Sequence, residues 1–249
     1  MDKKVIKLTE ADIHHMIVES VKKVLVEKYN NNDISEEKLE YIKSQLKNGV
    51  KPDDLFDDIG FSGVCDLYPF SIDGKWGYIN GNNEIIIEPI YDYATVIGGD
   101  QNYGTNYGFI YIDDYMGVIN KYGEVIIEPQ YDDIKVIYPY FMVNDASLGW
   151  NICDEFGDVL LNHWFKEGRV SVWKDLSLRD GIDLMIIICL GNLETYYLAT
   201  LDGEILNFDN PFYMVRHSVD GYYFNDDKNW YKLTQNGELV ETHDLDDDD

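Results

Sequence analysis

The sequence predicts a mainly β protein made of five antiparallel three-strand repeats in an open curved or superhelical array, with two N-terminal helices. An incomplete propeller-like ring is the alternative arrangement. Three observations predict this class: residues 74–92 recur in four later copies, each copy has a turn residue at a fixed place, and 20 tyrosines favour strands. One such unit cannot cover its own apolar face, so we expect neighbouring units to stack.

Each copy starts at a large anchor side chain and reaches its turn seven residues later. The anchors are Trp76, Met116, Trp150, Tyr196 and Trp230, and the turn residues, each followed by an acid, are Asn83, Gly123, Gly157, Gly203 and Gly237. Gly adopts positive φ without cost and Asn at little cost, so we predict a hairpin turn with this residue in the left-handed region. We expect each anchor to pack against the next unit, with a loss of roughly 3–5 kcal/mol for Trp→Ala.

A further strand is predicted before each anchor, at residues 67–72, 109–112, 138–144, 184–190 and 219–224. The first two copies also share a fixed order of residues. The matching residues are Trp76-Gly77, Glu88-Pro89 and Tyr91-Asp92 in the first, and Gly117, Glu128-Pro129 and Tyr131-Asp132 in the second. This order resembles the WG (tryptophan-glycine) repeat family, over roughly residues 65–240. The later copies depart from it, since Asn151, Tyr197 and Tyr231 replace the Gly and the Glu-Pro step is lost. The resemblance implies a repeat scaffold and supplies no catalytic residues.

Residues 1–60 are predicted to form a helical segment, with a helix at 9–29, a linker, and a helix at 35–48. The first helix has an apolar face that we consider a partner-binding candidate: Ile13, Ile17, Val21, Val24 and Leu25. It is either an end cap on the repeats or a docking tag. The stretch also resembles a helix found at the ends of otherwise unrelated proteins of gut bacteria and their phages, which implies an interchangeable tag.

The repeat domain is predicted at residues 61–243, followed by a disordered acidic tail at 244–249. The net charge is −27, and residues 61–249 hold 34 acidic and 10 basic side chains. Such a surface disfavours direct contact with nucleic acid or anionic membranes and attracts basic partners. Within the domain, residues 98–108 read as a long hairpin loop, whose Tyr103 and Tyr107 are candidates for partner binding.

The residues that carry chemistry are scattered. Three cysteines without C-x-x-C spacing indicate free thiols in a reducing compartment, and the N-terminus has no apolar secretion signal, so we expect a cytoplasmic protein. The histidines lack metal-ligand spacing, and most acids fit turns or solvated strand faces. We therefore expect no enzyme activity, metal or cofactor.

The expected function is a non-enzymatic protein-binding or scaffold module with an unidentified protein partner. The alternative is an acidic decoy for a basic, nucleic-acid-binding protein, as a phage or mobile element would use against a host. A lesser alternative is carbohydrate binding through exposed Tyr and Trp.

Overall fold

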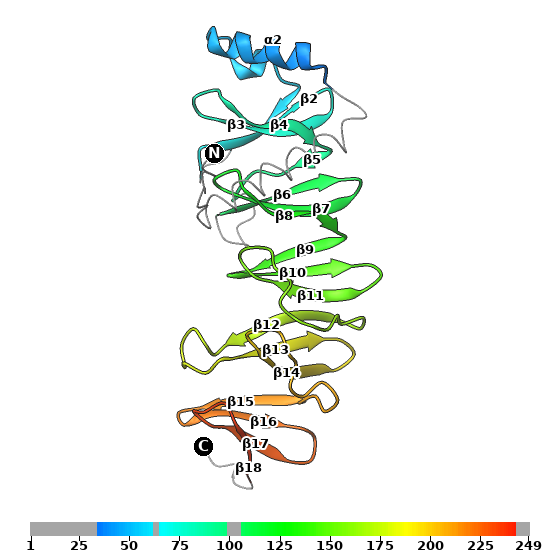
Figure 1. Ribbon diagram of the computed structural model, residues 1–249, viewed down its shortest axis with the longest axis vertical. Helices are drawn as coiled ribbons and strands as arrows, with labels where there is room; N and C mark the ends of the chain where they lie inside the picture. Colours follow the sequence, from blue (N-terminus) through cyan, green and yellow to red (C-terminus); the bar gives the residue numbers. More distant parts are fainter. Residues whose placement is uncertain (1–33, 62–64, 99–105, 243–249) are drawn as a thin grey trace, which may run out of the picture. The chain divides into compact units, whose positions relative to one another are not determined.

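The computed structural model describes residues 34–61, 65–98 and 106–242. Within these ranges the fold is mainly β, with five antiparallel sheets of three or four strands and one α-helix (Figure 1). The chain divides into two compact units, Met1–Val96 and Ile97–Asp249, and each is described by itself. The mainly β prediction is confirmed. Of the two predicted helices, the one at 35–48 is confirmed, and the one at 9–29 lies outside the described residues.

In the first unit, helix α2 and a short 3₁₀ turn precede one sheet with strand order β1-β2-β3-β4. The elements are α2 (Glu36–Lys47), η1 (Pro52–Asp54), β1 (Asp58–Ile59), β2 (Leu67–Ile72), β3 (Lys75–Asn80) and β4 (Ile85–Tyr91), followed by the two-residue strand β5 (Tyr93–Ala94).

Helix α2 covers one face of the first sheet. It begins at Ser35, whose Oγ accepts a hydrogen bond from the backbone N–H of Lys38, a usual N-cap arrangement. Its apolar side, which includes Ile42 and Leu46, packs in one buried cluster with strand residues such as Phe70. The second predicted helix thus covers an apolar face of this sheet, whereas the choice between an end cap and a docking tag for the helix at 9–29 lies outside the described residues.

The second unit contains four sheets in chain order (Figure 1). Their strands are β6 (Tyr107–Ile112), β7 (Tyr115–Asn120) and β8 (Val125–Tyr131); β9 (Asp133–Ile137), β10 (Tyr140–Asp145) and β11 (Gly149–Cys153); β12 (Arg169–Asp175), β13 (Leu184–Leu190) and β14 (Glu194–Thr200); and β15 (Met214–Ser218), β16 (Gly221–Asn225), β17 (Trp230–Leu233) and β18 (Leu239–Thr242).

Successive sheets of the second unit share buried clusters, so the inner sheets are apolar on both faces. In β13, Met185 and Ile187 join the cluster shared with the preceding sheet, and Leu184 and Ile186 join the cluster shared with the following one. Side chains of a strand alternate between its faces, which explains why residues 184–190 are continuously apolar. The run is a strand buried on both sides.

The predicted turn is confirmed in all five copies. The turn residues have positive φ, from 62° at Asn83 to 89° at Gly157. In each turn the residue three positions earlier accepts a hydrogen bond from the backbone N–H of the turn residue, and its side-chain oxygen accepts one from the N–H of the following acid. These five capping residues, which sequence reasoning missed, are Asn80, Asn120, Asp154, Thr200 and Thr234.

Two turn glycines also lie against the backbone of the preceding segment. A Cβ on Gly157 would lie 2.1 Å from the Ile126 carbonyl oxygen, and one on Gly203 would lie 1.7 Å from the Leu160 carbonyl oxygen. Glycine is therefore needed at these positions for space as well as for backbone conformation.

The glycine after the anchor has a different role, because its φ is not positive. A Cβ on Gly117 would lie 2.6 Å from the Ile127 carbonyl oxygen and 2.7 Å from the Pro129 nitrogen, and Gly77 is in the same position against β4. The register between β7 and β8 shifts at this point, so the backbone of β8 bulges toward the glycine. Proline is accepted at such a bulge because no ladder N–H is required there.

Replacing Gly117 by alanine is expected to destabilise the protein by roughly 2–3 kcal/mol, because the new methyl group meets a backbone that cannot rotate away. Unfolding in urea, followed by tryptophan fluorescence, measures the loss. Gly191→Ala is the matched control, since its Cβ would have its nearest neighbour at 3.8 Å, an ordinary contact. Equal losses at the two positions would contradict the close-approach explanation.

In the third copy a buried asparagine takes the place of this glycine. Asn151 is 0% exposed, and its Nδ2 donates to the carbonyl oxygens of Leu161 and His163. Its Oδ1 accepts from the backbone N–H of Leu161 and of Ile152. The side chain thereby pairs backbone groups where the returning strand is reduced to two isolated bridges. The prediction of three-strand units is corrected to sheets of three or four strands, since a strand that precedes the predicted three, β1 in the first sheet and β15 in the last, makes a fourth.

The anchors only partly fit the prediction of an inter-unit core. Met116 is buried in a cluster with residues of the next sheet, and Trp150 and Tyr196 pack against clusters that include the sheet after theirs. Apart from Met116, however, the anchors are only half-buried, including Trp76 and Trp230. Because a loss of about 3–5 kcal/mol applies to a fully buried ring, we now expect Trp→Ala at these anchors to cost less than this.

Candidate functional site

Most residues proposed as partner-binding candidates lie outside the described residues: Ile13, Ile17, Val21, Val24, Leu25 and Tyr103. Tyr107 is the exception. It begins strand β6, and its ring centroid lies 5.0 Å from that of Phe141, in an edge-on contact with a buried cluster. Burial raises the pKa of its phenol. The assignment of Tyr107 to a loop is therefore wrong, whereas its contact with a partner stays a prediction.

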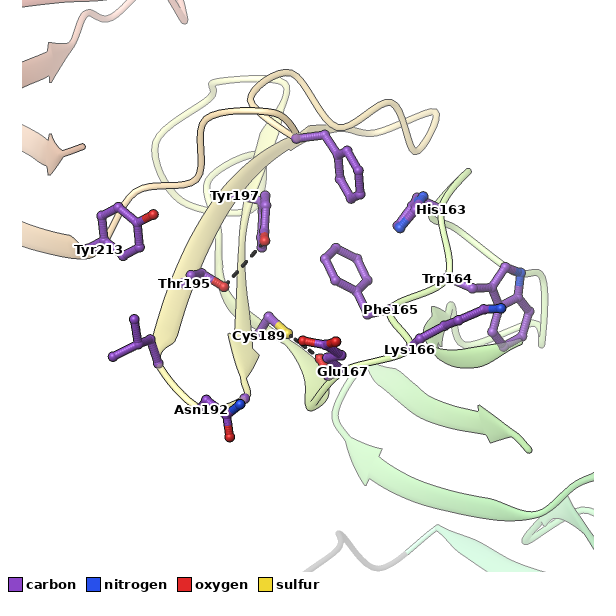
Figure 2. Close-up of a pocket in the computed structure, with 13 residues that line it drawn as sticks. His163, Trp164, Phe165, Lys166, Glu167, Cys189, Asn192, Thr195, Tyr197 and Tyr213 are labelled. Carbon is purple, nitrogen blue, oxygen red and sulfur yellow. Dashed lines mark hydrogen bonds between the residues drawn. The ribbon is translucent and has the colours of Figure 1, made fainter. Parts of the chain in front are cut away.

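The second unit has a pocket with a cavity volume of about 560 Å³ (Figure 2). One wall is the segment 163–167, which returns from the Asn151 strand and leads into β12. The other wall is the hairpin of β13 and β14, with Phe208 and Tyr213 from the connection to β15. Both walls depend on the irregular returning strands of the third and fourth copies.

Aromatic rings form most of the apolar lining. His163 and Phe208 have ring centroids 4.0 Å apart, and Phe165 lies 5.2 Å from Tyr197. Phe208 lies 6.2 Å from both Phe165 and Tyr197, so it links the two walls. Phe165 and Tyr197 are buried, whereas Phe208 is 42% exposed, Tyr213 is 44% exposed and Leu193 at the hairpin tip is 69% exposed.

Burial favours the neutral forms of three polar side chains in the pocket. Burial lowers the pKa of His163, raises the pKa of Tyr197, and raises the pKa of the Cys189 thiol. The Cys189 Sγ donates to the Glu167 carbonyl oxygen at 3.2 Å, and the Thr195 hydroxyl donates to the Tyr197 hydroxyl at 3.4 Å. A thiol with a raised pKa is a weak nucleophile, so Cys189 is not activated for attack at neutral pH.

Two charged side chains line the pocket and diverge. Figure 2 shows the Glu167 side chain beside Cys189, below the ring of Phe165, and Lys166 extending away toward Trp164. The carboxylate therefore faces the space enclosed by the rings more directly than the ammonium group does.

We expect the pocket wall to weaken in acid because of His163. Its folded-state pKa lies below the unfolded value, so the contribution to stability is present above the unfolded pKa, about 6.5, and is lost as pH falls through the folded pKa. The test compares melting temperatures at neutral and mildly acidic pH for the wild type and His163→Gln. The wild type should lose more on acidification than the variant, and an equal decrease in both would contradict the expectation.

A second cavity, of about 490 Å³, lies in the first unit between α2 and the first repeat turn. Its most prominent cation, Lys43, already pairs with Glu40 at 3.0 Å and with Glu88 at 2.9 Å. Because the ammonium group of Lys43 is already paired with two carboxylates, this cavity is a weaker candidate for a binding site than the aromatic pocket.

Among the described residues, no group of three or more His, Cys, Asp or Glu side chains is placed to hold a metal ion. In the same part of the chain, no helix is long and apolar enough to cross a membrane.

Sequence reasoning missed the pocket because its residues lie in the copies that depart most from the repeat. One signal was present: Phe165 pairs with the anchor Trp150 in the place where Tyr91 and Tyr131 pair with their anchors. Continuing the alignment to the bridge between Tyr196 and Phe212 would have marked both irregular segments as returning strands. Nothing in the sequence indicated that Phe208 would line the pocket.

Residues 76–100 and 116–139 match the model of the WG containing repeat. Among curated proteins, none matches this sequence.

The chain is also similar to several solved structures. A computationally designed protein, Ika8, is 11% identical, with 74% of this chain and 60% of that chain covered and a TM-score of 0.28. A protein of unknown function from Bacteroides caccae is 16% identical, with 55% and 54% covered and a TM-score of 0.25. PorZ, a surface component of the type-IX secretion system of Porphyromonas gingivalis, is 9% identical, with 75% and 28% covered and a TM-score of 0.29. This chain thus spans less than two thirds of each of these proteins, and at these TM-scores none of them bears on its function.

Proposed function

With two WG containing repeats as its recognised scaffold, we propose that this chain is a non-enzymatic protein-binding module. The observation that carries the proposal is the aromatic pocket of the second unit. Its rim exposes three large apolar side chains, Leu193, Phe208 and Tyr213, around a concave surface. Exposed apolar groups gathered at a hollow are typical of binding sites.

The occupant that fits is a basic polypeptide segment that inserts one side chain into the pocket. Residues 106–242 hold 23 acidic and 9 basic side chains, so the second unit as a whole carries a negative charge. Charge of this sign speeds the approach of basic partners and repels acidic ones, while an inserted side chain supplies the affinity.

The test measures binding of fluorescently labelled peptides to the full chain by anisotropy. One peptide set has Lys- and Arg-rich flanks around a variable central residue, and a second set has Glu- and Asp-rich flanks. We expect binding of the basic set alone. We also expect Phe208→Ala to weaken it by about tenfold or more, since an exposed aromatic ring that a partner covers on binding can contribute over 1.4 kcal/mol.

Phe156→Ala is the matched control. Phe156 is exposed at a repeat turn of the same unit and does not line the pocket. Its loss should leave peptide binding unchanged. Binding of the basic set that survives Phe208→Ala, or that falls equally in both variants, would overturn the role of the pocket.

The acidic decoy remains a second candidate because of the same excess of acidic side chains. A decoy would bind a basic protein through many exposed charges, and its affinity would fall steeply as salt is added. Pocket binding would depend less on salt and would be sensitive to Phe208→Ala. Measuring peptide affinity at low and high salt in the wild type and in this variant separates the two proposals.

A further inference from the structure

We propose that the aromatic pocket accepts the cationic end of a lysine or arginine side chain, with Glu167 as its counter-charge. This inference rests on the proposed function and specifies which side chain of the basic partner enters the pocket. The faces of aromatic rings attract cations, and a cation within about 6 Å of a ring centroid gains from this contact.

One ring of the pocket is open to a cation from solvent. Phe165, Tyr197 and Phe208 have pairwise centroid distances of 5.2 to 6.2 Å, so the three rings are in contact with one another and no cation fits between them. Phe165 and Tyr197 are buried, whereas Phe208 is 42% exposed. A cation that enters the pocket can therefore lie over the exposed part of the Phe208 ring, which the other two rings hold in place.

The neighbouring titratable groups do not oppose a cation. Burial keeps the pKa of His163 below its ordinary value, so the imidazole is neutral at pH 7 and contributes a ring without a positive charge. The phenol of Tyr197, whose pKa is raised by burial, is neutral as well. Lys166 is the one cation that lines the pocket within the described residues, and Figure 2 shows it extending toward Trp164, away from the Tyr197 ring.

Glu167 supplies the negative charge that a desolvated cation requires. Its side chain is exposed and lies on the Cys189 side of the pocket, where Figure 2 also places Asn192. The methylene stem of a lysine entering from solvent would pass the exposed side chain of Leu193, and apolar stems of this kind pack well on such surfaces.

The experiment uses one basic peptide whose central lysine is varied, with the full chain as receptor. The central residue is lysine, arginine, trimethyllysine or norleucine, and norleucine keeps the stem but removes the charge. We expect norleucine to bind about tenfold or more weakly than lysine, a difference of about 1.4 kcal/mol, while trimethyllysine and arginine retain binding.

Glu167→Gln should weaken binding of the lysine peptide severalfold and leave binding of the norleucine peptide unchanged, which distinguishes a counter-charge from a structural role. Glu155→Gln is the matched control, because Glu155 is exposed at a turn of the same unit and does not line the pocket. It should leave both affinities as they are.

Norleucine binding as tight as lysine, still sensitive to Phe208→Ala, would overturn the inference and leave the proposed function standing with an apolar anchor. Equal effects of Glu167→Gln and Glu155→Gln would overturn the role of Glu167. Failure of every basic peptide to bind would remove the inference together with the proposed function.

Discussion

Replacing Gly203 by valine is expected to destabilise the protein by roughly 3–5 kcal/mol. Two costs combine at this position. Gly203 has φ +88°, where a β-branched side chain costs about 1–3 kcal/mol, and its Cβ would meet the Leu160 carbonyl oxygen at 1.7 Å, which forces a backbone shift. That shift would also disturb the hydrogen bond from the Asn162 N–H to the Gly203 carbonyl.

The measurement is the change in urea midpoint, and the control is Gly181→Val. Gly181 has φ +67° but nothing within 4 Å of the Cβ position, so it shows the conformational cost alone. We expect a loss of about 1–2 kcal/mol there. Similar losses at the two glycines would mean that the contact with Leu160 contributes nothing.

Asn151→Asp is expected to cost roughly 3–5 kcal/mol at neutral pH, although the two side chains have nearly the same shape. The carboxylate loses both amide donors, which leaves the carbonyl oxygens of Leu161 and His163 unpaired, and it places a charge at a position that is 0% exposed. Asn236→Asp, at an exposed turn, is the isosteric control and should change stability by less than about 0.5 kcal/mol.

The stability deficit of Asn151→Asp relative to the wild type should also depend on pH. Burial raises the folded-state pKa of the new carboxyl above its unfolded value of about 3.9. The deficit relative to wild type is therefore smallest below that unfolded pKa and grows as pH rises through the folded pKa. A deficit of constant size across this range would show that the carboxyl is solvated, and that Asn151 is less enclosed than the structure indicates.

Local sequence signals allowed the turns, the mainly β class and the second helix to be predicted. Positive φ at Asn83 and at Gly123 follows from which residues tolerate that backbone region. The cap at Ser35 and the end of α2 near Asn48 follow from helix-terminus preferences. These features need no knowledge of distant contacts.

The pocket could not be predicted because it depends on segments that lack a regular pattern. Residues 154–168 and 201–213 carry isolated bridges rather than continuous strands, so the side-chain alternation that assigns a face is interrupted. The prediction that the anchor side chains are core residues was only partly right, for a related reason. Trp150 is large enough to suggest a core position, but the buried positions of β11 are Asn151, Ile152 and Cys153.

In the first two units the backbone of the returning strand lies close to the glycine after the anchor, and this contact limits which of the two features can change first. While the Glu-Pro strand bulges toward the glycine, any side chain at that glycine clashes, as the 2.6 Å distance at Gly117 shows. A unit can carry a side chain there only where this bulge is absent: the third unit uses Asn151 to pair the backbone groups, and in the fifth Tyr231 pairs with Glu241 in a regular ladder. The two changes are thus epistatic, with the loss of Glu-Pro permissive for the other. The WG containing repeat is matched at 76–100 and 116–139, the two units that keep both the glycine and the Glu-Pro step. The number of recognisable motifs therefore underestimates the number of structural units in diverged proteins of this kind.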